Sequence, residues 1–541
     1  MRFIAVIFLT TLTALAQSPL AQHISHDQAV RDTRTFINLL EDTHPDPYTA
    51  FGGRIEFRRK AQAILAGLPQ DGIVVADLAA RLRELIVPLA GHTGLNDGGW
   101  RDPDWWLPIQ FTVATDGIVL ATSDLEELGG LNGYRLTGAN GHPVEKIAQE
   151  MRVHVRYENR SGALNGITNV VRSRKFMLDL FAGDDPDQIT FQLQGPTGAI
   201  VDRRVPWAER RKFDADKCLR GQPHWSRLPA SDDPFFTTIF DQPGAAYLRV
   251  ANIMGREAYE IAWRSNTGDV REMLKDYYQR RNAAAPEDIA AAIHGVPSFF
   301  ETAIGLLTEM KRRQIPTLII DLRGNNGGWT ASVIPVLAAL YGDAFYSEDF
   351  PGQYITRESA LFLQKYNSTV SEWRLKSGNP LFEPGDYSFE TTMIASGPPA
   401  SRREKTIAEY KQRGYSFAAA LESLNGQPLY RPKNVVVLTD PGTYSAAFHF
   451  LYYLHHMGAK SVGVPPSQSP NAFMETTDFT LPESKLRGFI ANSLQLYMPE
   501  EPKADTFPVD HPLTCEVLQR YGFDRETAVR YALDLIAAGK L

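Results

Sequence analysis

Ser445 stands where a buried strand would end and a helix would begin. Residues 436–447 read VVLTDPGTYSAA, so an apolar run leads through a Pro-Gly turn to the serine and two alanines. The positive end of a helix dipole favours a developing alkoxide or oxyanion, so this position suits a nucleophile. A serine at this position also suits a helix N-cap, and the local pattern leaves both interpretations open.

A second strand–loop–helix unit precedes the serine along the chain. Residues 318–328 read LIIDLRGNNGG, a buried-type strand that runs into a glycine-rich loop, and a helix is expected over 329–341. Glycines let backbone N–H groups approach a ligand closely, so such a loop can stabilise an oxyanion or bind a phosphate. The run lacks the lysine of a P-loop, which disfavours nucleotide binding. A tight connection without any ligand is the alternative.

A serine nucleophile needs a general base, and His92 is the best-placed histidine. It lies in a turn-like run, AGHTG over residues 90–94. A lone loop histidine is otherwise an ordinary surface residue, so its choice depends on Ser445 being a nucleophile. Three more histidines, His449, His455 and His456, follow the serine on the same expected helix, where aromatic neighbours indicate a packing face rather than a metal site.

Composition describes an ordinary globular protein and excludes several functional classes. The chain has 541 residues, of which 43% are hydrophobic and 22% charged, with a net charge of -7. A nucleic-acid-binding surface would need a basic stripe, so no nucleic-acid partner is expected. No HExxH or CxxC motif occurs, so we expect no metal and no other cofactor. The two cysteines, Cys218 and Cys515, would pair in an oxidising compartment or stay free.

The N-terminus predicts a secretory signal peptide. Arg2 precedes an apolar run over residues 3–16, which ends in the small-x-small sequence ALA before Gln17. The run is shorter than the ~20 residues of a membrane span. We expect cleavage near Ala16 or Ala21 and a secreted or periplasmic protein. No later stretch looks long and apolar enough to cross a membrane, so no integral span is expected after cleavage.

The chain is too long for one hydrophobic core and predicts several domains. Helical spacing covers residues 25 to about 90, short β-like runs and an Asn140-Gly141 hairpin signal follow, and buried strands recur from residue 245 onward. The predicted division is a signal peptide over 1–22, an N-terminal helical domain over 23–100, a mixed β-rich middle region over 101–240, and an α/β catalytic core over 241–541 with insertions near 255–300 and 345–430.

Together these pieces resemble the tail-specific, or C-terminal processing, protease family and its tricorn-core relatives. Residues 321–328 look like that family's D-L-R-x-N-x-G-G motif, and residues 443–447 look like its T-x-S-A-(A/S) nucleophile segment. Residues 91–95 are similar to the G-H-T segment of the members that use histidine. Residues 140–147 resemble an I-N-G-x-P-V-x-x-I segment that lies between that segment and the D-L-R-x-N-x-G-G motif. The order of the pieces also matches.

The resemblance implies a fold and a reaction. The fold is a multidomain α/β chain with a crotonase/ClpP-like ββα catalytic core, an N-terminal helical domain and a small β-rich middle domain. The reaction is hydrolysis of a peptide or protein through an acyl-enzyme on Ser445. The oxyanion hole would consist of the backbone amide of Ala446 and that of Gly327 or Gly328.

The sequence departs from the family pattern at three places. Where the lysine-using branch has its base, this chain has Ser469, so His92 becomes the expected general base. The acidic residue expected after the nucleophile helix is replaced, since residues 463–465 read GVP. No residue is evident that would orient His92, and the candidates are Asp97, Asp510 or a serine.

Two other functions fit the same sequence. One is a protein that binds an apolar ligand or a peptide, with the aromatic helix over 448–453 lining the pocket. The other is an esterase or amidase that uses the same serine. The region 105–147 has room for a PDZ-like module, which the sequence does not decide. The sequence leaves the substrate specificity and the oligomeric state unknown.

Overall fold

The computed structural model describes residues 19–96, 105, 107–123, 125–152, 155–209, 225, 228, 233–265, 269–390 and 397–541. Most of the expected signal peptide lies outside these residues, and so do Asp97 and Cys218. The cleavage site and the role suggested for Asp97 therefore stay predictions. Cys515 is a free thiol in the structure.

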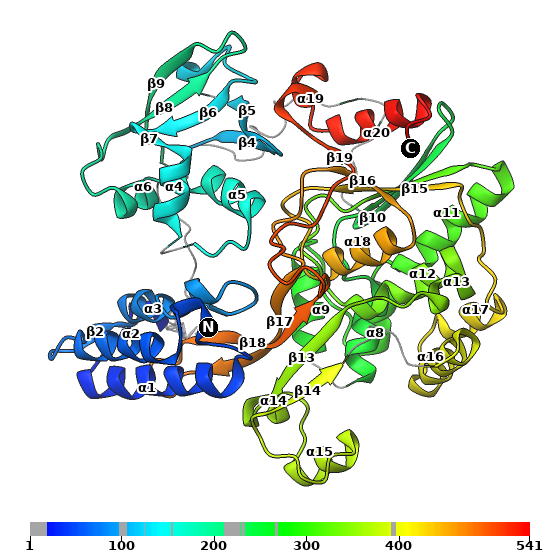
Figure 1. The fold of residues 1–541 in the computed structure, drawn as a ribbon, viewed down its shortest axis with the longest axis horizontal. Helices are drawn as coiled ribbons and strands as arrows, with labels where there is room; N and C mark the ends of the chain where they lie inside the picture. Colours follow the sequence, from blue (N-terminus) through cyan, green and yellow to red (C-terminus); the bar gives the residue numbers. More distant parts are fainter. Residues whose placement is uncertain are drawn as a thin grey trace, which may run out of the picture.

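A six-stranded sheet forms the centre of the molecule (Figure 1), with the order β10-β11-β12-β15-β16-β19. The first pair is antiparallel, and all other neighbours are parallel. The apolar runs predicted as buried strands form β12 and β15. The strands are β10 (Phe235–Phe240), β11 (Ala245–Val250), β12 (Thr317–Asp321), β15 (Asn434–Thr439), β16 (Lys460–Gly463) and β19 (His511–Pro512).

Both faces of this sheet are covered, which explains its uninterrupted apolar strands. Leu318 and Ile320 point into one core cluster, and Ile319 points into the other. The first cluster is closed by α11 (Phe299–Arg313), α12 (Ile334–Tyr341) and α18 (Ala446–His456), and the second by α19 (Cys515–Arg520), α20 (Thr527–Ala537) and the middle region. Two loops therefore meet at the carboxyl edge of the sheet, the glycine-rich loop after β12 and the Ser445 turn after its neighbour β15.

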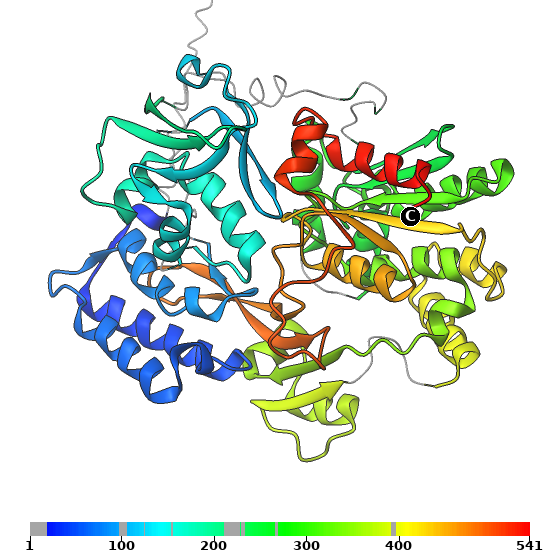
Figure 2. The same ribbon diagram turned by 45° about the horizontal axis from the view of Figure 1, so that its top comes forward.

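A second, antiparallel sheet joins the core to the N-terminal helices. Its order is β14-β13-β18-β17, and the short β3 pairs with β18. Its long β17–β18 hairpin, drawn in orange, reaches from the core to the blue helices in both views (Figures 1 and 2), and it was not predicted from the sequence. The strands are β3 (Gly94–Leu95), β13 (Gln353–Glu358), β14 (Asp386–Glu390), β17 (Asn471–Thr480) and β18 (Arg487–Leu496).

The N-terminal helices form where helical spacing predicted them. A capping box on Ser25 and Gln28 starts the first helix. Apolar side chains of the three helices share a cluster with Phe479 and Ile490 of the long hairpin. The elements are η1 (Pro19–Ala21), β1 (His23–Ile24), α1 (His26–Thr43), η2 (Thr49–Phe51), α2 (Arg54–Ala66), β2 (Ile73–Val74), α3 (Val75–Arg83) and η3 (Val87–Leu89).

The middle region is a five-stranded antiparallel sheet with the order β4-β5-β6-β8-β9, to which the short β7 adds on β6. Asn140 and Gly141 both have positive φ, 52° and 77°, in the hairpin turn that their sequence predicted. The elements are β4 (Ile109–Ala114), β5 (Gly117–Ser123), η4 (Glu126–Leu128), β6 (Arg135–Ala139), β7 (His142–Pro143), α4 (Val144–Met151), α5 (Arg160–Val170), α6 (Arg174–Leu180), β8 (Gln188–Gln194) and β9 (Ile200–Pro206).

The two expected insertions are mainly helical, but β13 and β14 lie within the second. Its strand β13 pairs with β18, so this segment contributes to the second sheet. The remaining elements are α8 (Arg256–Arg264), α9 (Val270–Gln279), α10 (Ile289–His294), η6 (Thr330–Ser332), α13 (Asp343–Ser347), α14 (Ala360–Lys365), α15 (Val370–Ser377), α16 (Pro399–Arg413) and α17 (Ala418–Ser423). The mixed α/β multidomain class expected from the sequence is confirmed.

One stretch of the described chain, Ile289–Arg313, is long and apolar enough to cross a membrane by length and composition alone. The expectation that no stretch after the signal peptide is long and apolar enough to span a membrane was therefore wrong by these two measures, length and composition. The stretch consists of α10 and α11, and 44% of its apolar window is buried inside the protein. Phe300 and Leu307 of α11 pack in the core beside the central sheet, and a core helix of this kind meets the same criterion.

Candidate active site

Ser445 lies at the junction of the β15 turn and α18 in a strained backbone conformation. Its φ is 55° and its ψ -126°. Such a conformation costs a residue with a side chain about 1–3 kcal/mol, and it is found mainly at functional sites. The Ser445 side chain makes no capping hydrogen bond, so the interpretation of this serine as a helix cap is wrong.

Hydrogen bonds between the two loops hold the serine turn against the glycine-rich loop. The Tyr444 amide donates to the carbonyl of Asn325 at 2.9 Å, and the Thr443 hydroxyl donates to the carbonyl of Leu322 at 2.9 Å. Asn325 is fully buried, and its side-chain amide donates to the Val250 carbonyl at the end of β11 at 2.8 Å. The ends of three neighbouring strands therefore fix the turn.

The glycine-rich loop approaches the serine so closely that only glycine fits. A Cβ on Gly327 would lie 2.6 Å from Ser445 Cβ and 2.9 Å from the Ala446 nitrogen. The Gly327 amide donates to Asn325 Oδ1 at 2.9 Å, so it is not available to an oxyanion. Within the described part of the chain, the amides of Gly328 and Ala446 donate no hydrogen bond. The geometry therefore favours Gly328 over Gly327 as the partner of Ala446 in an oxyanion hole.

The acidic and basic residues of the glycine-rich loop are structural. Asp321 is buried and accepts hydrogen bonds from the Tyr247 hydroxyl at 2.7 Å and from the Arg323 guanidinium at 2.6 Å. Burial, the largest single effect, would raise the pKa of Asp321, but the charge of Arg323 and the hydrogen bonds from Arg323 and Tyr247 together hold that pKa below its usual value. Arg323 also binds Glu526, just before α20, at 2.8 Å. These residues fix the base of the loop through their hydrogen bonds to one another.

His92 lies beside the serine turn. Its imidazole is stacked on the ring of Tyr444, the residue before Ser445, with 5.1 Å between ring centroids and 25° between planes. Burial, followed by the nearby charge of Arg156, lowers the pKa of His92 to about 4. The ring is thus neutral near pH 7, the form in which a histidine can accept a proton. No hydrogen bond joins this ring to Ser445 in the structure.

The β17–β18 hairpin holds the His92 turn in place. The His92 amide donates to the carbonyl of Phe473 in β17 at 2.8 Å, and the Thr93 hydroxyl accepts from the amide of Ala491 in β18 at 3.0 Å. Gly91 has a positive φ of 59°, and a Cβ there would lie 2.3 Å from the Phe473 carbonyl oxygen. The histidine position is therefore set by residues almost 400 positions later in the chain.

Among the carboxylates that the structure describes, none is hydrogen-bonded to His92. Asp510, one of the candidates, instead binds the Lys460 ammonium at 3.0 Å and the Ser461 amide at 2.9 Å, so that suggestion was wrong. His92 Nδ1 is buried and has no hydrogen-bond partner, neither a carboxylate nor a serine, among the described residues. A buried unpaired polar atom costs about 1–3 kcal/mol and calls for an explanation such as a catalytic role.

Gln468 contacts the serine directly and was missed in the sequence. Its Oε1 accepts a hydrogen bond from the Ser445 amide at 2.5 Å, and its side chain is fully buried. Its neighbour Ser469, which occupies the place of the family's lysine, donates to the carbonyls of Glu158 at 3.2 Å and Asp505 at 2.8 Å. Ser469 therefore holds its own loop through these two hydrogen bonds, and Gln468 fixes the backbone of Ser445.

His449 is a second imidazole near the serine. Its amide donates to the Ser445 carbonyl at 3.0 Å, its Nδ1 lies 2.7 Å from the Thr330 hydroxyl, and its Nε2 is buried without a partner among the described residues. Burial, then the proximity of His92, lowers its pKa to about 3. The ring stacks on Tyr497 with centroids 5.0 Å apart, as expected for a packing face. Its spacing of four residues from Ser445 was the signal that could have marked it as a neighbour of the site.

The aromatic residues of α18 do not provide a ligand pocket. Phe448, Phe450, Tyr452 and Tyr453 are all buried within the core cluster formed with α11 and α12. The expectation that this helix lines an apolar binding pocket was therefore wrong, because its side chains fill the core.

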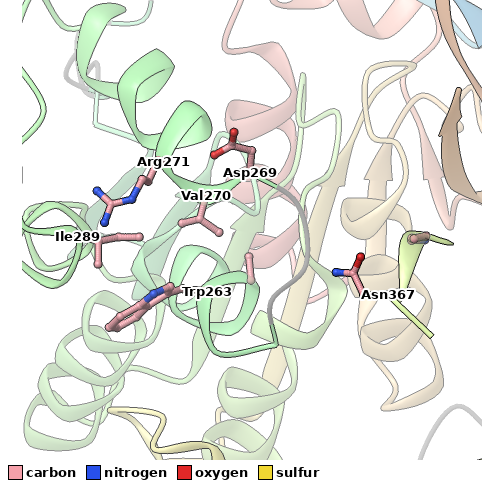
Figure 3. Close-up of a pocket in the computed structure, with 8 residues that line it drawn as sticks. Trp263, Asp269, Val270, Arg271, Ile289 and Asn367 are labelled. Atoms are coloured by element: carbon pink, nitrogen blue, oxygen red, sulfur yellow. The ribbon is translucent and has the colours of Figure 1, made fainter. Parts of the chain in front are cut away.

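A pocket of about 510 Å³ lies between the first insertion and the end of α14 (Figure 3). Figure 3 shows Trp263 and Ile289 on one side of it and Asn367 across from them. Neither Ser445 nor His92 lines it. Its Trp263 belongs to the same small apolar cluster as Trp329, which follows the glycine-rich loop.

Comparison with known proteins gives one family match within the sequence. Residues 296–484 match the family model described as Peptidase family S41. This segment contains the glycine-rich loop and Ser445 but not His92. No curated protein matches the chain.

Solved structures match over nearly the whole chain. Mature CPAF complexed with lactacystin matches with a TM-score of 0.52 and 15% identity, over 95% of this chain and 98% of that one. Mature CPAF alone gives 0.51 and 15%, over 95% and 96%. The photosystem II D1 C-terminal processing protease gives 0.40 and 13%, over 95% and 98%. At this identity the likeness to CPAF is a likeness of fold. The roles of Ser445, His92, Ala446, Gly327 and Gly328 stay predictions.

Proposed function

Because the chain is a serine-type peptidase whose residues 296–484 belong to Peptidase family S41, we propose that it cleaves its substrates through an acyl-enzyme on Ser445, with His92 as the general base. The family assignment confirms the resemblance to the tail-specific proteases, and peptides or proteins are the substrates it implies. The nucleophile and the base are the parts that this proposal adds.

One observation carries the proposal: Ser445 is strained and uncapped, and the amides of Ala446 and Gly328, which belong to the two loops that meet here, donate no hydrogen bond among the described residues. Ser445 Oγ attacks the carbonyl carbon of the scissile bond while His92 accepts its proton. The two amides stabilise the resulting oxyanion, and such a donor lowers the barrier by about 3–4 kcal/mol. His92 then gives the proton to the leaving amine, and water, deprotonated by His92, releases the acid.

Burial keeps the His92 imidazole neutral near pH 7, and the neutral ring is the form that can accept a proton from Ser445. A pKa of about 4 leaves the ring unprotonated at neutral pH, although it also makes the ring a weaker base than an imidazole with a pKa near 7. Its stacking on Tyr444 keeps it next to the serine turn. An apo enzyme need not show the serine–histidine hydrogen bond, because such contacts often tighten only when substrate binds.

The test is hydrolysis of an unstructured protein such as casein by the wild-type chain and by Ser445→Ala. The serine is not a helix cap, so we expect the variant to keep its melting temperature and to lose turnover by at least about 10³-fold. Wild-type turnover in the variant would refute the nucleophile. Rapid cleavage of simple esters together with inert peptides would instead favour the esterase or amidase alternative.

We also propose that the protein is exported. The proposal is supported by the Arg2 start, the apolar run over 3–16 and the small-x-small sequence before Gln17. Mass spectrometry of the mature protein from its native host should find an N-terminus just after Ala16 or Ala21. An intact Met1 in a cytosolic fraction would contradict export.

A further inference from the structure

A short irregular segment, residues 156–159, contacts three parts of the candidate site. It joins α4 to α5 in the middle region. Here it is called the site strap and comprises Arg156, Tyr157, Glu158 and Asn159.

The strap holds the His92 turn through Arg156. The Arg156 guanidinium donates to the carbonyl of Gly91 at 3.1 Å and also to the carbonyl of Thr93. These carbonyls flank His92 on both sides. One guanidinium therefore fixes the backbone before and after the proposed base.

The strap holds the nucleophile turn through Glu158. The Tyr444 hydroxyl donates a short hydrogen bond to Glu158 Oε1, and the Ser469 amide donates to Glu158 Oε2 at 2.8 Å. Each carboxylate oxygen thus accepts from a different loop. Removing such an acceptor leaves two part-buried donors unpaired, each at a cost of about 1–3 kcal/mol.

The strap is itself anchored on both sides. Asn159 caps α5 by accepting from the Gly162 amide at 2.9 Å, and its Nδ2 donates to the Pro466 carbonyl at 2.9 Å. The Tyr157 hydroxyl instead donates back to the Ala148 carbonyl in α4 at 3.0 Å. Glu158 is therefore presented to Tyr444 from a fixed support.

We propose that Glu158 is a positioning residue that holds the Tyr444 ring in place. That ring stacks on the His92 imidazole, and Tyr444 is bonded directly to Ser445, so its position affects both residues. The proposal rests on the proposed function, since it needs Ser445 and His92 to be the reacting pair. Glu158 touches neither of them and acts through Tyr444. In this way a residue of the middle region governs the geometry of a site built by the core.

The charge of Glu158 matters as well as its shape. Burial raises the pKa of Glu158 to about 7, against the opposing effects of its hydrogen bonds from Tyr444 and Ser469 and of the charge of Arg156. When Glu158 is ionised, both of its oxygens can accept, one from Tyr444 and one from Ser469. When it is protonated, one oxygen becomes an O–H donor. We therefore expect the fully ordered site above pH 7 and a looser one below it.

The experiment measures kcat and KM for peptide hydrolysis at pH 8 in Glu158→Ala, Glu158→Gln and Tyr444→Phe. We expect Glu158→Ala to lower kcat by about 10–100-fold with KM changed less than about threefold, because misplacement of the reacting groups affects the transition state more than binding. Glu158→Gln can still accept from Ser469 and donate to the Tyr444 oxygen, so it should lie between Glu158→Ala and wild type. Tyr444→Phe keeps the ring but loses the bond, and should lose about tenfold.

Tyr157→Phe is the matched control, because it removes a tyrosine hydroxyl of the same strap whose hydrogen bond does not reach the site. It should keep wild-type kcat. The double variant Glu158→Ala/Tyr444→Phe should be no worse than Glu158→Ala alone, since both remove one interaction. Melting temperatures separate misfolding from misplacement, and Tyr444→Phe keeps the test valid if Glu158→Ala does not fold.

Two outcomes separate this inference from the proposed function. If His92→Gln abolishes turnover while Glu158→Ala and Tyr444→Phe match the Tyr157→Phe control, the positioning role is overturned and the Ser445–His92 mechanism stands. If His92→Gln keeps wild-type kcat, the mechanism fails, and the role of Glu158 fails with it.

Discussion

The imidazole of His92 lies stacked on the ring of Tyr444, with 5.1 Å between the ring centroids. Tyr444 directly precedes Ser445, whose amide donates to the buried Gln468. One aromatic ring therefore connects the proposed base to the proposed nucleophile, although His92 and Ser445 lie far apart in the sequence.

His92, and not His449, is expected to act as the base. His449 Nδ1 already lies 2.7 Å from the Thr330 hydroxyl, and its ring is packed against Tyr497. His92→Gln should therefore lower kcat/KM by about 10²–10⁴-fold, the range typical of general bases, and His449→Gln by less than about tenfold. Steady-state kinetics on one peptide substrate compares the two. The reverse order of losses would identify His449 as the base.

Gly327 is expected to tolerate no side chain. A Cβ at this position would lie 2.6 Å from Ser445 Cβ, and the backbone φ of 105° disfavours any other residue. Gly327→Ala should lower kcat by at least about 100-fold, because it displaces the serine and the Ala446 amide together.

The control for this variant is Gly305→Ala, in the middle of α11, where an added Cβ meets nothing within 4 Å. It should keep full activity and raise the melting temperature slightly, since alanine favours a helix by about 1 kcal/mol. If Gly327→Ala is as active as Gly305→Ala, the close approach of the two loops is not as described.

Asn325 is expected to stabilise the fold as well as the site. Its side chain donates to the Val250 carbonyl and accepts from the Gly327 amide, and it is fully buried. Asn325→Ala should lower the free energy of unfolding by about 2–4 kcal/mol, because it leaves two buried partners unpaired. Urea unfolding measures this change. The exposed Asn169→Ala on α5 is the control and should stay within about 0.5 kcal/mol of wild type; equal effects of the two would refute the prediction.

Activity is expected to rise with pH in two separate steps. His92, with a pKa of about 4, loses its proton first, and Glu158, with a pKa of about 7, loses its proton next. Both deprotonated forms are the active ones, so kcat/KM should increase through pH 4 and again, several-fold, through pH 7. Glu158→Gln should remove only the upper step and match wild type near pH 6. An unchanged upper step in that variant would assign it to another group.

The sequence was informative where the chemistry is local and uninformative where it depends on distant contacts. The strand, turn and small residues around Ser445 are contiguous, so the turn was predicted. The contacts that place His92 come from Phe473 and Ala491. Both lie on the long β17–β18 hairpin, whose strands were not predicted from the sequence. Tertiary contacts that join residues almost 400 positions apart leave no periodic pattern to read.

Two other residues escaped prediction for different physical reasons. Glu158 lies in the irregular segment between α4 and α5, and its proposed role depends on where Tyr444 and Ser469 lie in three dimensions. Gln468 directly precedes Ser469, which occupies the position of the lysine base in the lysine-using branch of the family. An amide that fixes a nucleophile's backbone has no recognisable spacing of its own, whereas a lysine base would have had one.

The most direct test of the central claim is covalent labelling with a serine-directed phosphonate, read by mass spectrometry of the digested protein. The account predicts a single adduct on Ser445 in the wild-type chain, formed at least about 100-fold more slowly in His92→Gln. An adduct on another residue, no adduct at all, or equal labelling rates in the two proteins would contradict it.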